Sequence, residues 1–377
     1  MNFAPPRRLQ GIEKSVIRQV FDRALPGSIN LGLGEPDLPT PDIIRQAAVR
    51  AIVEEQNGYT SHAGLPALRE KVANDYPYLE AKPERVIITA GSQEALYLAL
   101  LALVDEGDEV LLPNPGFVAY PTIVRMAGGT ASFYRLPRET GFAFDRDEFR
   151  RALTPRTKVV VCISPSNPTG RVLTNDDLAS IADAVKDHGA YLISDEIYRE
   201  LYYTAERPET LSTYYDNTIV ISGLSKSMSM TGWRLGWLCG DEAVVQAALV
   251  LHGYVTTCAS AVSQKASLVA WTVEAESARA GFRNTFRARR DHLLRLIESE
   301  LKLKAVTPDG AFYTMLNVSQ YGPSMPVAEA LLREKVITVP GAAFGSESEG
   351  FLRVSFCADQ ATLDEGVQRI KRGLANL

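Results

Sequence analysis

Cysteine and histidine are scarce in this sequence, which has four of each among 377 residues. The cysteines, Cys162, Cys239, Cys258 and Cys357, lie far apart and form no Cys-x-x-Cys pair. Their spacing therefore predicts neither a zinc site nor a disulfide framework. We expect four buried, reduced thiols and no bound metal, which is usual for a cytoplasmic protein.

Blocks of charge and long apolar runs are scarce as well. The chain has 40 basic and 45 acidic residues and a net charge of −5, so we expect no nucleic-acid partner. Residues 243–264 lack Asp, Glu, Lys and Arg, but they include Gln246, His252 and Thr256 and are too polar to span a bilayer. The first eleven residues contain no apolar core, so we expect no signal peptide, no membrane association and a cytoplasmic location.

From about residue 85 onwards, apolar strand patterns alternate with helical patterns. The run KVVVCI at 158–163 is almost entirely apolar, which is typical of a strand buried on both faces of a parallel sheet. We expect strands at 85–89, 109–112, 158–163, 190–194 and 218–221, and helices at 91–104, 117–126 and 175–186. This order predicts an α/β fold with a mostly parallel sheet sandwiched by helices.

The last third of the sequence has a different pattern. A long, charged, amphipathic helix is expected from residue 279 to about 301. Short strands at 312–316, 337–339 and 352–356 and a last helix at 364–374 follow it. This indicates a smaller α+β unit. We expect a large domain at residues 40–278 and a small domain made of residues 1–39 and 279–377.

Polar residues follow four of the expected strands, at the edge where open α/β sheets bind their ligands. Taken singly, each of them fits a helix cap, a turn or a surface position. Their succession along the chain instead predicts one site with an anion cradle at a helix start, an amide, an acid, a phenol, an amine and a guanidinium. The residues concerned are Gly91, Ser92, Asn167, Asp195, Tyr198, Lys226 and Arg234.

The segment GLSKSMSMTGWRLG at 223–236 resembles the lysine signature of the class I/II pyridoxal-phosphate-dependent aminotransferases, in the fold-type I, aspartate aminotransferase superfamily. Further matches are NLGLGEPD from residue 30, YTSHAGLPALRE from 59, SNPTG from 166, DEIY from 195, PDGAFY from 308 and GFLRVS from 350. The resemblance thus covers nearly the whole chain. It implies a seven-stranded type of sheet, a smaller α+β domain and pyridoxal 5'-phosphate as the cofactor.

The resemblance assigns catalytic roles to Lys226, Asp195 and Tyr198. Lys226 would hold the cofactor as a Schiff base and would then move the proton of the substrate Cα. Asp195 would keep the pyridine nitrogen protonated, so that the ring withdraws electrons. Tyr198 and Asn167 would form hydrogen bonds to the phenolic oxygen of the cofactor.

The resemblance also implies how phosphate and substrate are bound. Arg234 would pair with the phosphate. Helix-terminal donors would come from Gly91, Ser92 and Gln93. Ser225 would supply a hydroxyl, and Phe117 would be the aromatic ring stacked on the cofactor. Arg353 would bind the substrate carboxylate, with Asn167 and the backbone of Gly34 close to the substrate. Tyr59 would reach the phosphate of the neighbouring subunit, which implies a homodimer with shared active sites.

Two departures from the family pattern concern the phosphate and the substrate. Gly223 stands where many members have serine, so one phosphate hydroxyl is missing. Dicarboxylate-specific members supply a second cation, either where this chain has Gln93 or from a partner segment that is 254–260 here and has no basic residue. An unpaired distal carboxylate would be costly, so aspartate is not the first substrate we expect. Basic residues near the N-terminus that could pair with it are Arg7, Arg8 and Lys14.

We therefore predict an aminotransferase that moves an amino group between an α-amino acid and a 2-oxo acid, both small molecules, by a ping-pong cycle. A carbon–sulfur β-lyase, an amino-acid cyclase or another eliminating enzyme on the same scaffold is the alternative, because all begin by removing the same proton. A cofactor-binding regulator is disfavoured, since the aminotransferase-like pattern begins within the first 30 residues. The sequence identifies neither the amino acid nor the oxo acid.

Overall fold

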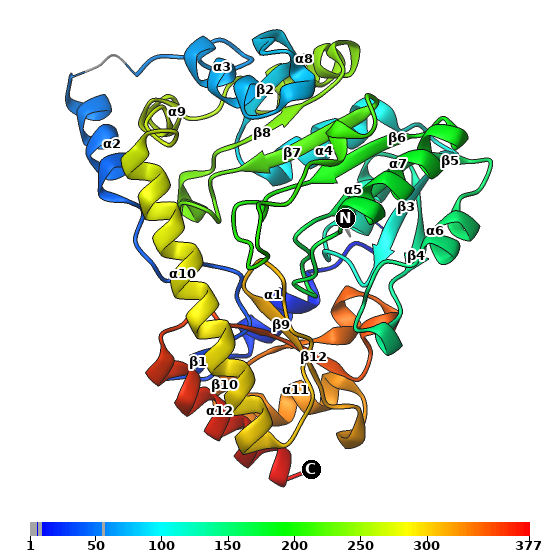
Figure 1. Cartoon of the computed structure of the whole chain (residues 1–377), viewed down its shortest axis with the longest axis vertical. Helices are drawn as coiled ribbons and strands as arrows, with labels where there is room; N and C mark the ends of the chain where they lie inside the picture. The colour runs from blue at the N-terminus through cyan, green and yellow to red at the C-terminus, as the bar shows by residue number, and fades with distance from the viewer. Residues whose placement is uncertain (1–5, 7–9, 55–56) are drawn as a thin grey trace, which may run out of the picture.

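A seven-stranded sheet dominates the protein, as the computed structural model in Figure 1 shows. The structure describes residues 6, 10–54 and 57–377. The strands of the sheet are β2 (Val86–Thr89), β3 (Glu109–Asn114), β4 (Thr130–Arg135), β5 (Thr157–Ile163), β6 (Tyr191–Asp195), β7 (Thr218–Gly223) and β8 (Gly236–Cys239). Their order is β2-β8-β7-β6-β5-β3-β4, and β8 alone runs antiparallel to its neighbours. The sheet is therefore mostly parallel, as predicted.

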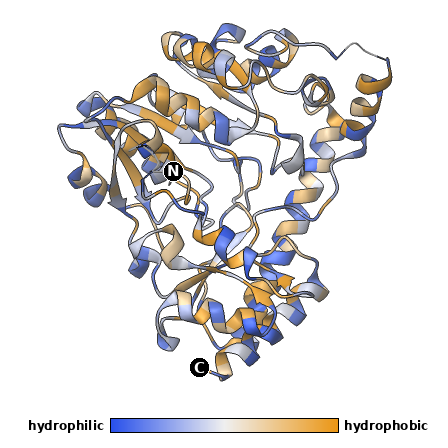
Figure 2. Ribbon diagram, turned by 180° about the vertical axis from the view of Figure 1, so that it is seen from behind, coloured by the Kyte–Doolittle hydropathy of each residue, from blue (hydrophilic) through white to orange (hydrophobic). Residues whose placement is uncertain are grey.

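Helices cover both faces of this sheet. They are α2 (Asp42–Glu54), α3 (Pro66–Asn74), α4 (Ser92–Leu103), α5 (Tyr120–Met126), α6 (Arg146–Ala152), α7 (Asn175–His188), α8 (Glu242–Val255) and α9 (Ala261–Ser267). On β5, Val159 and Val161 pack into the core that contains α4 and α8, while Val160 and Cys162 pack into the core beneath α6 and α7. Both faces are buried, so the strand is apolar at successive positions. Figure 2 shows apolar residues along the strands of this sheet.

The smaller part of the fold lies at the bottom of Figure 1 and contains two short sheets. One is antiparallel and has the order β11 (Val339–Pro340), β12 (Phe351–Ser355), β9 (Tyr313–Asn317). In the other, β1 (Ile29–Asn30) pairs in parallel with β10 (Val336–Ile337), which joins the N-terminal segment to the C-terminal part. The helices of this part are α1 (Val16–Asp22), α11 (Ser324–Arg333) and α12 (Gln360–Ala375).

A single long helix, α10 (Val273–Leu296), runs from the large sheet into the smaller part. It begins six residues before the expected start at 279, because the side chain of Thr272 caps it by accepting the N–H of Ala275. The helix continues as a π-helical turn, Ile297–Leu301. The expected boundary at 278/279 thus falls inside a helix.

Several other sequence-based expectations need correction. The helix predicted from residue 117 begins at Tyr120, because 117–119 form a turn. Two strands of the sheet were not predicted. β4 is a partly exposed edge strand with a mixed pattern, and β8 has only four residues and lies at the end of the lysine motif. The run at 337–339 belongs to two short strands in different sheets. The prediction of four buried thiols is wrong for Cys258, which is partly exposed between α8 and α9.

Within the described ranges, no helix combines the length and the apolar character that crossing a bilayer requires. The same residues contain no group of three or more His, Cys, Asp or Glu side chains placed to hold a metal ion.

Candidate active site

A pocket of about 250 Å³ lies at the carboxyl ends of β5, β6 and β7, where β12 faces the large sheet. Ligands of open α/β sheets bind at this edge. The predicted residues that line the pocket are Gly34, Ser92, Gln93, Phe117, Asn167, Asp195, Tyr198, Ser225, Lys226, Arg234 and Arg353. Residues more than 300 positions apart in the sequence thus meet in one cavity.

Asp195 is the last residue of β6 and is buried at the base of the pocket. Its carboxylate accepts a hydrogen bond from the hydroxyl of Tyr120 at 2.8 Å and another from the N–H of Ile197 at 3.2 Å. Burial raises the pKa of Asp195 to about 6, because the charged form is poorly solvated there. The group is an acid held ready for a cationic partner.

Lys226 lies three residues after β7 and points into the same pocket. Its Nζ donates to the carbonyl oxygen of Gly34 at 2.7 Å. Burial lowers the pKa of Lys226 to about 8, since the ammonium loses its hydration. About one tenth of this amine is therefore uncharged at pH 7, far more than for an ordinary lysine, and the uncharged form is the one that attacks a carbonyl carbon and accepts a proton.

Arg353 projects from β12 towards the large sheet and is buried. Its Nη1 donates to Oδ1 of Asn167 at 2.8 Å, and its Nη2 donates to the carbonyl oxygen of Gly32 at 2.5 Å. The guanidinium lies 4.2 Å from the ring centroid of Tyr313, whose hydroxyl is 2.9 Å from that of Tyr198. The arrangement fixes a planar cation beside the amine and the acid, as a carboxylate-binding site requires.

The anion cradle forms where β2 passes into α4. Gly91 adopts φ +94 and α4 begins at the next residue, so the helix presents its unpaired N–H groups and its positive dipole end to the pocket. Arg234 lies against this turn, with Nη1 donating to the carbonyl of Thr231 at 2.9 Å and Nη2 to that of Ala90 at 3.4 Å. A Cβ on Gly91 would lie 2.5 Å from Nη2 of Arg234.

Two further glycines permit close contacts that a side chain would block. A Cβ on Gly34 would lie 1.8 Å from the hydroxyl oxygen of Tyr313. A Cβ on Gly223 would lie 2.8 Å from the carbonyl oxygen of Leu235 on the adjoining segment. At this position, where many members have serine, the backbones of the two segments approach closely in this chain.

Two predicted residues do not line the pocket. Gly91 lies behind Arg234 and shapes the cradle without facing the cavity. Tyr59 is 89% exposed and lies on the outside of the single chain. Of the three basic residues near the N-terminus, Arg7 and Arg8 lie outside the described residues, and Lys14 forms a surface ion pair with Asp22 at 3.1 Å.

Sequence reasoning missed several residues of the site. Tyr120 and Tyr313 hold Asp195 and Tyr198 by hydrogen bonds. The available signals were weak: Tyr120 lies about one helical turn after Phe117, and Tyr313 ends the PDGAFY motif. The remaining pocket residues with no predicted role are Ile17, Leu33, Leu96, Ile163, Ile197 and Thr231.

The set of side chains fits pyridoxal 5'-phosphate. Its aldehyde needs a partly uncharged amine, its ring nitrogen a buried carboxylate, and its phosphate a helix N-terminus with an arginine. The pocket contains Lys226, Asp195, and Arg234 beside the start of α4. A second arginine, Arg353, lines the same pocket and has the planar charged group that can bind a carboxylate.

Comparison with known proteins agrees with this fit. The family model for aminotransferase class I and II matches residues 26–370. The aspartate/prephenate aminotransferase of Thermus thermophilus is 37% identical over 98% of both chains, and the probable aspartate aminotransferase of Methanocaldococcus jannaschii is 35% identical over 97% of this chain and 98% of the relative.

Similarity to solved structures extends over the entire fold. The structure of Thermus thermophilus aspartate aminotransferase with maleate superposes with a TM-score of 0.94 at 35% identity, covering 99% of this chain and 100% of the other. The pyridoxal-phosphate fold of type I predicted from the sequence is thereby confirmed. The chain belongs to the class I and II aminotransferases and is a pyridoxal-phosphate-dependent enzyme that transfers amino groups in amino-acid metabolism.

Proposed function

We propose that Lys226, Asp195 and Arg353 carry the reaction, with Lys226 bound to the cofactor and Arg353 bound to the substrate carboxylate. The observation that carries this proposal is the convergence of all three side chains on one pocket from β6, the β7 loop and β12. When bound, the cofactor withdraws electrons from the substrate Cα. Arg353 orients the amino acid so that its Cα–H lies within reach of Lys226.

Lys226 is the proposed general base and acid at the substrate Cα. A pKa lowered to about 8 by burial supports this role, because proton transfer is efficient when the pKa lies near the working pH. Asp195 would hold a proton on the ring nitrogen. Tyr198 and Asn167 line the same pocket as Asp195, and they would offer a hydroxyl and an amide to the cofactor's phenolic oxygen.

The phosphate is proposed to lie at the start of α4. Arg234 supplies the charge, and Ser92, Gln93 and Ser225 supply neutral donors at the same end of the pocket. Gly91 permits the turn, and Phe117 lies where it would stack on the ring. These assignments account for every polar side chain predicted for the cofactor except Tyr59.

We further propose a cytoplasmic homodimer in which Tyr59 reaches the partner's phosphate. Its exposure to solvent supports a role outside its own chain. Apolar residues exposed on α2 and at the end of α8, namely Val49, Ile52, Val53, Tyr254 and Val255, form a candidate interface. The segment that contains Tyr59 lies next to the end of α8, since a Cβ on Gly253 would lie 3.2 Å from Nδ1 of His62. We also propose the division into a large domain, 40–278, and a small domain, 1–39 with 279–377.

For the substrate, we propose an amino acid with a neutral side chain. Relatives bear the names of aspartate, prephenate and aromatic-amino-acid aminotransferases, so the family accepts both classes. Lysine and arginine in the described lining of this pocket are limited to Lys226, Arg234 and Arg353, which already have roles. Ile17 and Leu33 add apolar surface.

The test is a donor screen by single turnover. Purified holoenzyme is mixed with each common amino acid, and the absorbance of bound cofactor is followed. Conversion to the pyridoxamine form by neutral donors, with reversal by a 2-oxo acid, is the expected result. If no donor produces this conversion, the assignment to transamination fails. Release of ammonia and a 2-oxo acid with no acceptor present would instead indicate an eliminating enzyme.

The matched variant is Lys226→Ala, which removes the amine and retains the rest of the pocket. We expect loss of turnover and cofactor that dissociates on dialysis. Full activity in this variant would remove Lys226 from the mechanism. Faster conversion by aspartate than by any neutral donor would overturn the proposed substrate class and leave the role of Lys226 intact.

A further inference from the structure

We infer that Glu196 and Arg199 are positioning residues for the catalytic pair, and that Arg199 neutralises a carboxylate buried directly behind Asp195. This inference rests on the proposed roles of Asp195 and Lys226. Neither Glu196 nor Arg199 lines the cofactor pocket. Both line a second cavity of about 350 Å³ that lies beside the same strand ends.

The two cavities share the backbone of the catalytic residues. Asp195 lines the cofactor pocket and Glu196, the next residue, lines the second cavity. The same alternation occurs after β7, where Lys226 lines the pocket and Ser227 lines the second cavity. A movement of the chain on the side of the second cavity therefore shifts the amine and the acid together.

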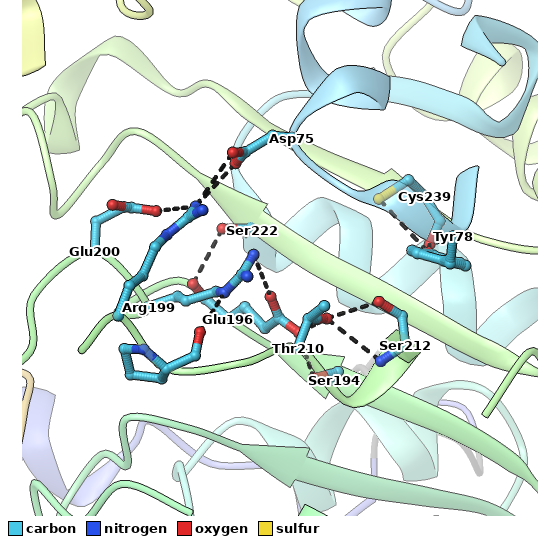
Figure 3. Close-up of polar contacts among 12 residues, drawn as sticks. Asp75, Tyr78, Ser194, Glu196, Arg199, Glu200, Thr210, Ser212, Ser222 and Cys239 are labelled. Atoms are coloured by element: carbon cyan, nitrogen blue, oxygen red, sulfur yellow. Dashed lines mark hydrogen bonds and ion pairs between the residues drawn. The ribbon is translucent and has the colours of Figure 1, made fainter. Parts of the chain in front are cut away.

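The main chain of Glu196 joins the end of β6 to the end of β7 (Figure 3). Its N–H donates to the carbonyl of Ile221 at 2.8 Å, and its own carbonyl accepts from the hydroxyl of Ser222 at 3.1 Å. Lys226 follows Ser222 by four residues. These two hydrogen bonds, together with the pairing of Asp195 with Ile221 in the sheet, fix the position of Asp195 relative to the lysine loop.

The side chain of Glu196 is held from several directions and is only 3% exposed. Oε1 accepts from the hydroxyls of Ser194, at 2.9 Å, and Thr210. Oε2 lies 3.5 Å from Nη1 of Arg199, which is also buried. Nε of Arg199 donates to the carbonyl of Pro208 at 2.9 Å, which anchors the guanidinium to the segment that carries Thr210.

A buried carboxylate next to Asp195 matters for the cofactor because the two negative charges repel. Burial raises the pKa of Asp195 in the first place, and the charge of Glu196 adds to that rise. An uncompensated charge at Glu196 would therefore favour the protonated form of Asp195, which pairs poorly with a protonated ring nitrogen. Arg199 opposes this, since its Nη1 lies 3.5 Å from Oε2 of Glu196, and both residues line the second cavity, which Asp195 does not line.

The same cavity contains a second ion-paired group that serves as a control. Arg207 pairs with Asp75 at 3.1 Å and with Glu200. Glu200 is also partly buried and carries the same charge as Glu196, but Asp75 remains as a partner for Arg207 if Glu200 is changed. Glu200→Gln therefore changes the charge of this cavity and leaves the pair of Glu196 and Arg199 intact.

The experiment compares the dissociation constant of pyridoxal 5'-phosphate in four proteins between pH 6 and pH 8. They are the wild type, Arg199→Gln, the double variant Glu196→Gln/Arg199→Gln, and Glu200→Gln. At pH 6, close to the pKa of Asp195, Arg199→Gln should raise the constant by about fivefold, because a rise of about one unit in that pKa leaves most of the carboxylate protonated. The double variant, which removes both charges, should return most of the lost affinity. Glu200→Gln should stay within about twofold of the wild type.

Rescue by the double variant distinguishes charge neutralisation from simple packing. If packing alone mattered, the protein that lacks both side chains would bind the cofactor less well than the Arg199→Gln variant. A double variant as weak as Arg199→Gln, or an Arg199→Gln protein that binds normally, would overturn the inference. If Arg199→Gln fails to fold, Arg199→Lys is used in its place, because it keeps the cation. This variant should bind the cofactor with a dissociation constant within about threefold of the wild-type value, and a larger loss of affinity would also overturn the inference. Affinity is measured without turnover, so failure of the wild type to transaminate is a separate result.

Discussion

At the scale of single residues, the burial of Asp195 lowers the stability of the folded chain. Asp195 is buried, and its hydrogen-bond donors, Tyr120 and Ile197, are neutral. In the proposed complex, the ring nitrogen of the cofactor would supply the cationic hydrogen-bond donor for this carboxylate. A destabilised group of this kind is common at active sites, where stability is exchanged for function.

Replacing Asp195 by asparagine should stabilise the protein without cofactor and weaken cofactor binding. The folded-state pKa of about 6 exceeds the unfolded value of 3.8, so the free energy of unfolding falls as pH rises through that window, by up to about 3 kcal/mol. The substituted side chain carries no charge, and at neutral pH the apoprotein of the Asp195→Asn variant should melt at a higher temperature than the wild-type apoprotein. Thermal unfolding followed with and without pyridoxal phosphate tests both effects.

The control for this experiment is Glu109→Gln. Glu109 is also buried, but Thr154, Thr157 and Arg156 satisfy its carboxylate away from the site. That variant should lose stability, because it leaves donors poorly paired. An Asp195→Asn apoprotein that melts below the wild type would show that the charge of Asp195 is not a burden.

The sequence predicts the site residues that belong to a local motif. It does not predict those that act only through a partner far away along the chain. Lys226 and Arg234 lie in one signature, and Asp195 follows an apolar strand directly. Tyr120 and Tyr313 act through hydrogen bonds to residues 75 and 115 positions away. Only the folded chain reveals such pairs, because no local pattern records them.

At the scale of elements, the turn between β2 and α4 combines strain, a helix dipole and an arginine. Gly91 has φ +94, a conformation that residues with a side chain rarely adopt. It also leaves room for Arg234, which is itself held at φ +53. The cradle therefore depends on one residue having no side chain.

Gly91→Ala should weaken cofactor binding by about tenfold, because the added Cβ would lie 2.5 Å from Nη2 of Arg234 and would displace its guanidinium. The control is Gly141→Ala, which has φ +67 but nothing within 4 Å of the added Cβ. Backbone strain should cost Gly141→Ala about 1 kcal/mol of stability, and it should cost Gly91→Ala more, because the ψ of 162 at Gly91 lies outside the left-handed helical region; chemical denaturation would measure both losses. Equal cofactor affinity in the two would contradict a role for the space at Gly91.

Elements were predictable in proportion to their burial. β5, β6 and β7 are apolar on both faces and follow turn residues, so their patterns are strong. The edge strand β4 has one partly solvated face, and the short antiparallel β8 lies beside the catalytic loop, where sequence choice serves the site. The expected start of α10 was late because its first turns, rich in Glu and Ala, carry little apolar pattern.

At the scale of the whole molecule, the active site belongs to both parts of the fold. Lys226 and Asp195 come from the large sheet, whereas Arg353 comes from β12 in the smaller one. The α10 helix bridges the parts, and Asp37 of the N-terminal segment pairs with Arg289 of that helix at 2.6 Å. Neither part alone contains the complete set of groups, so the pocket requires the assembled chain.

The proposed dimer extends this dependence across subunits, and hybrid dimers test it. Tyr59→Ala should lower cofactor affinity, and Lys226→Ala should abolish turnover. If Tyr59 serves the partner's site, a hybrid of the two variants contains one site with both substitutions and one with neither. Random mixing makes about half of the dimers hybrids, so activity at limiting cofactor should approach about one quarter of the wild-type value. A tyrosine that serves its own subunit would leave every hybrid site defective, and mixing would then restore nothing beyond the average of the parents.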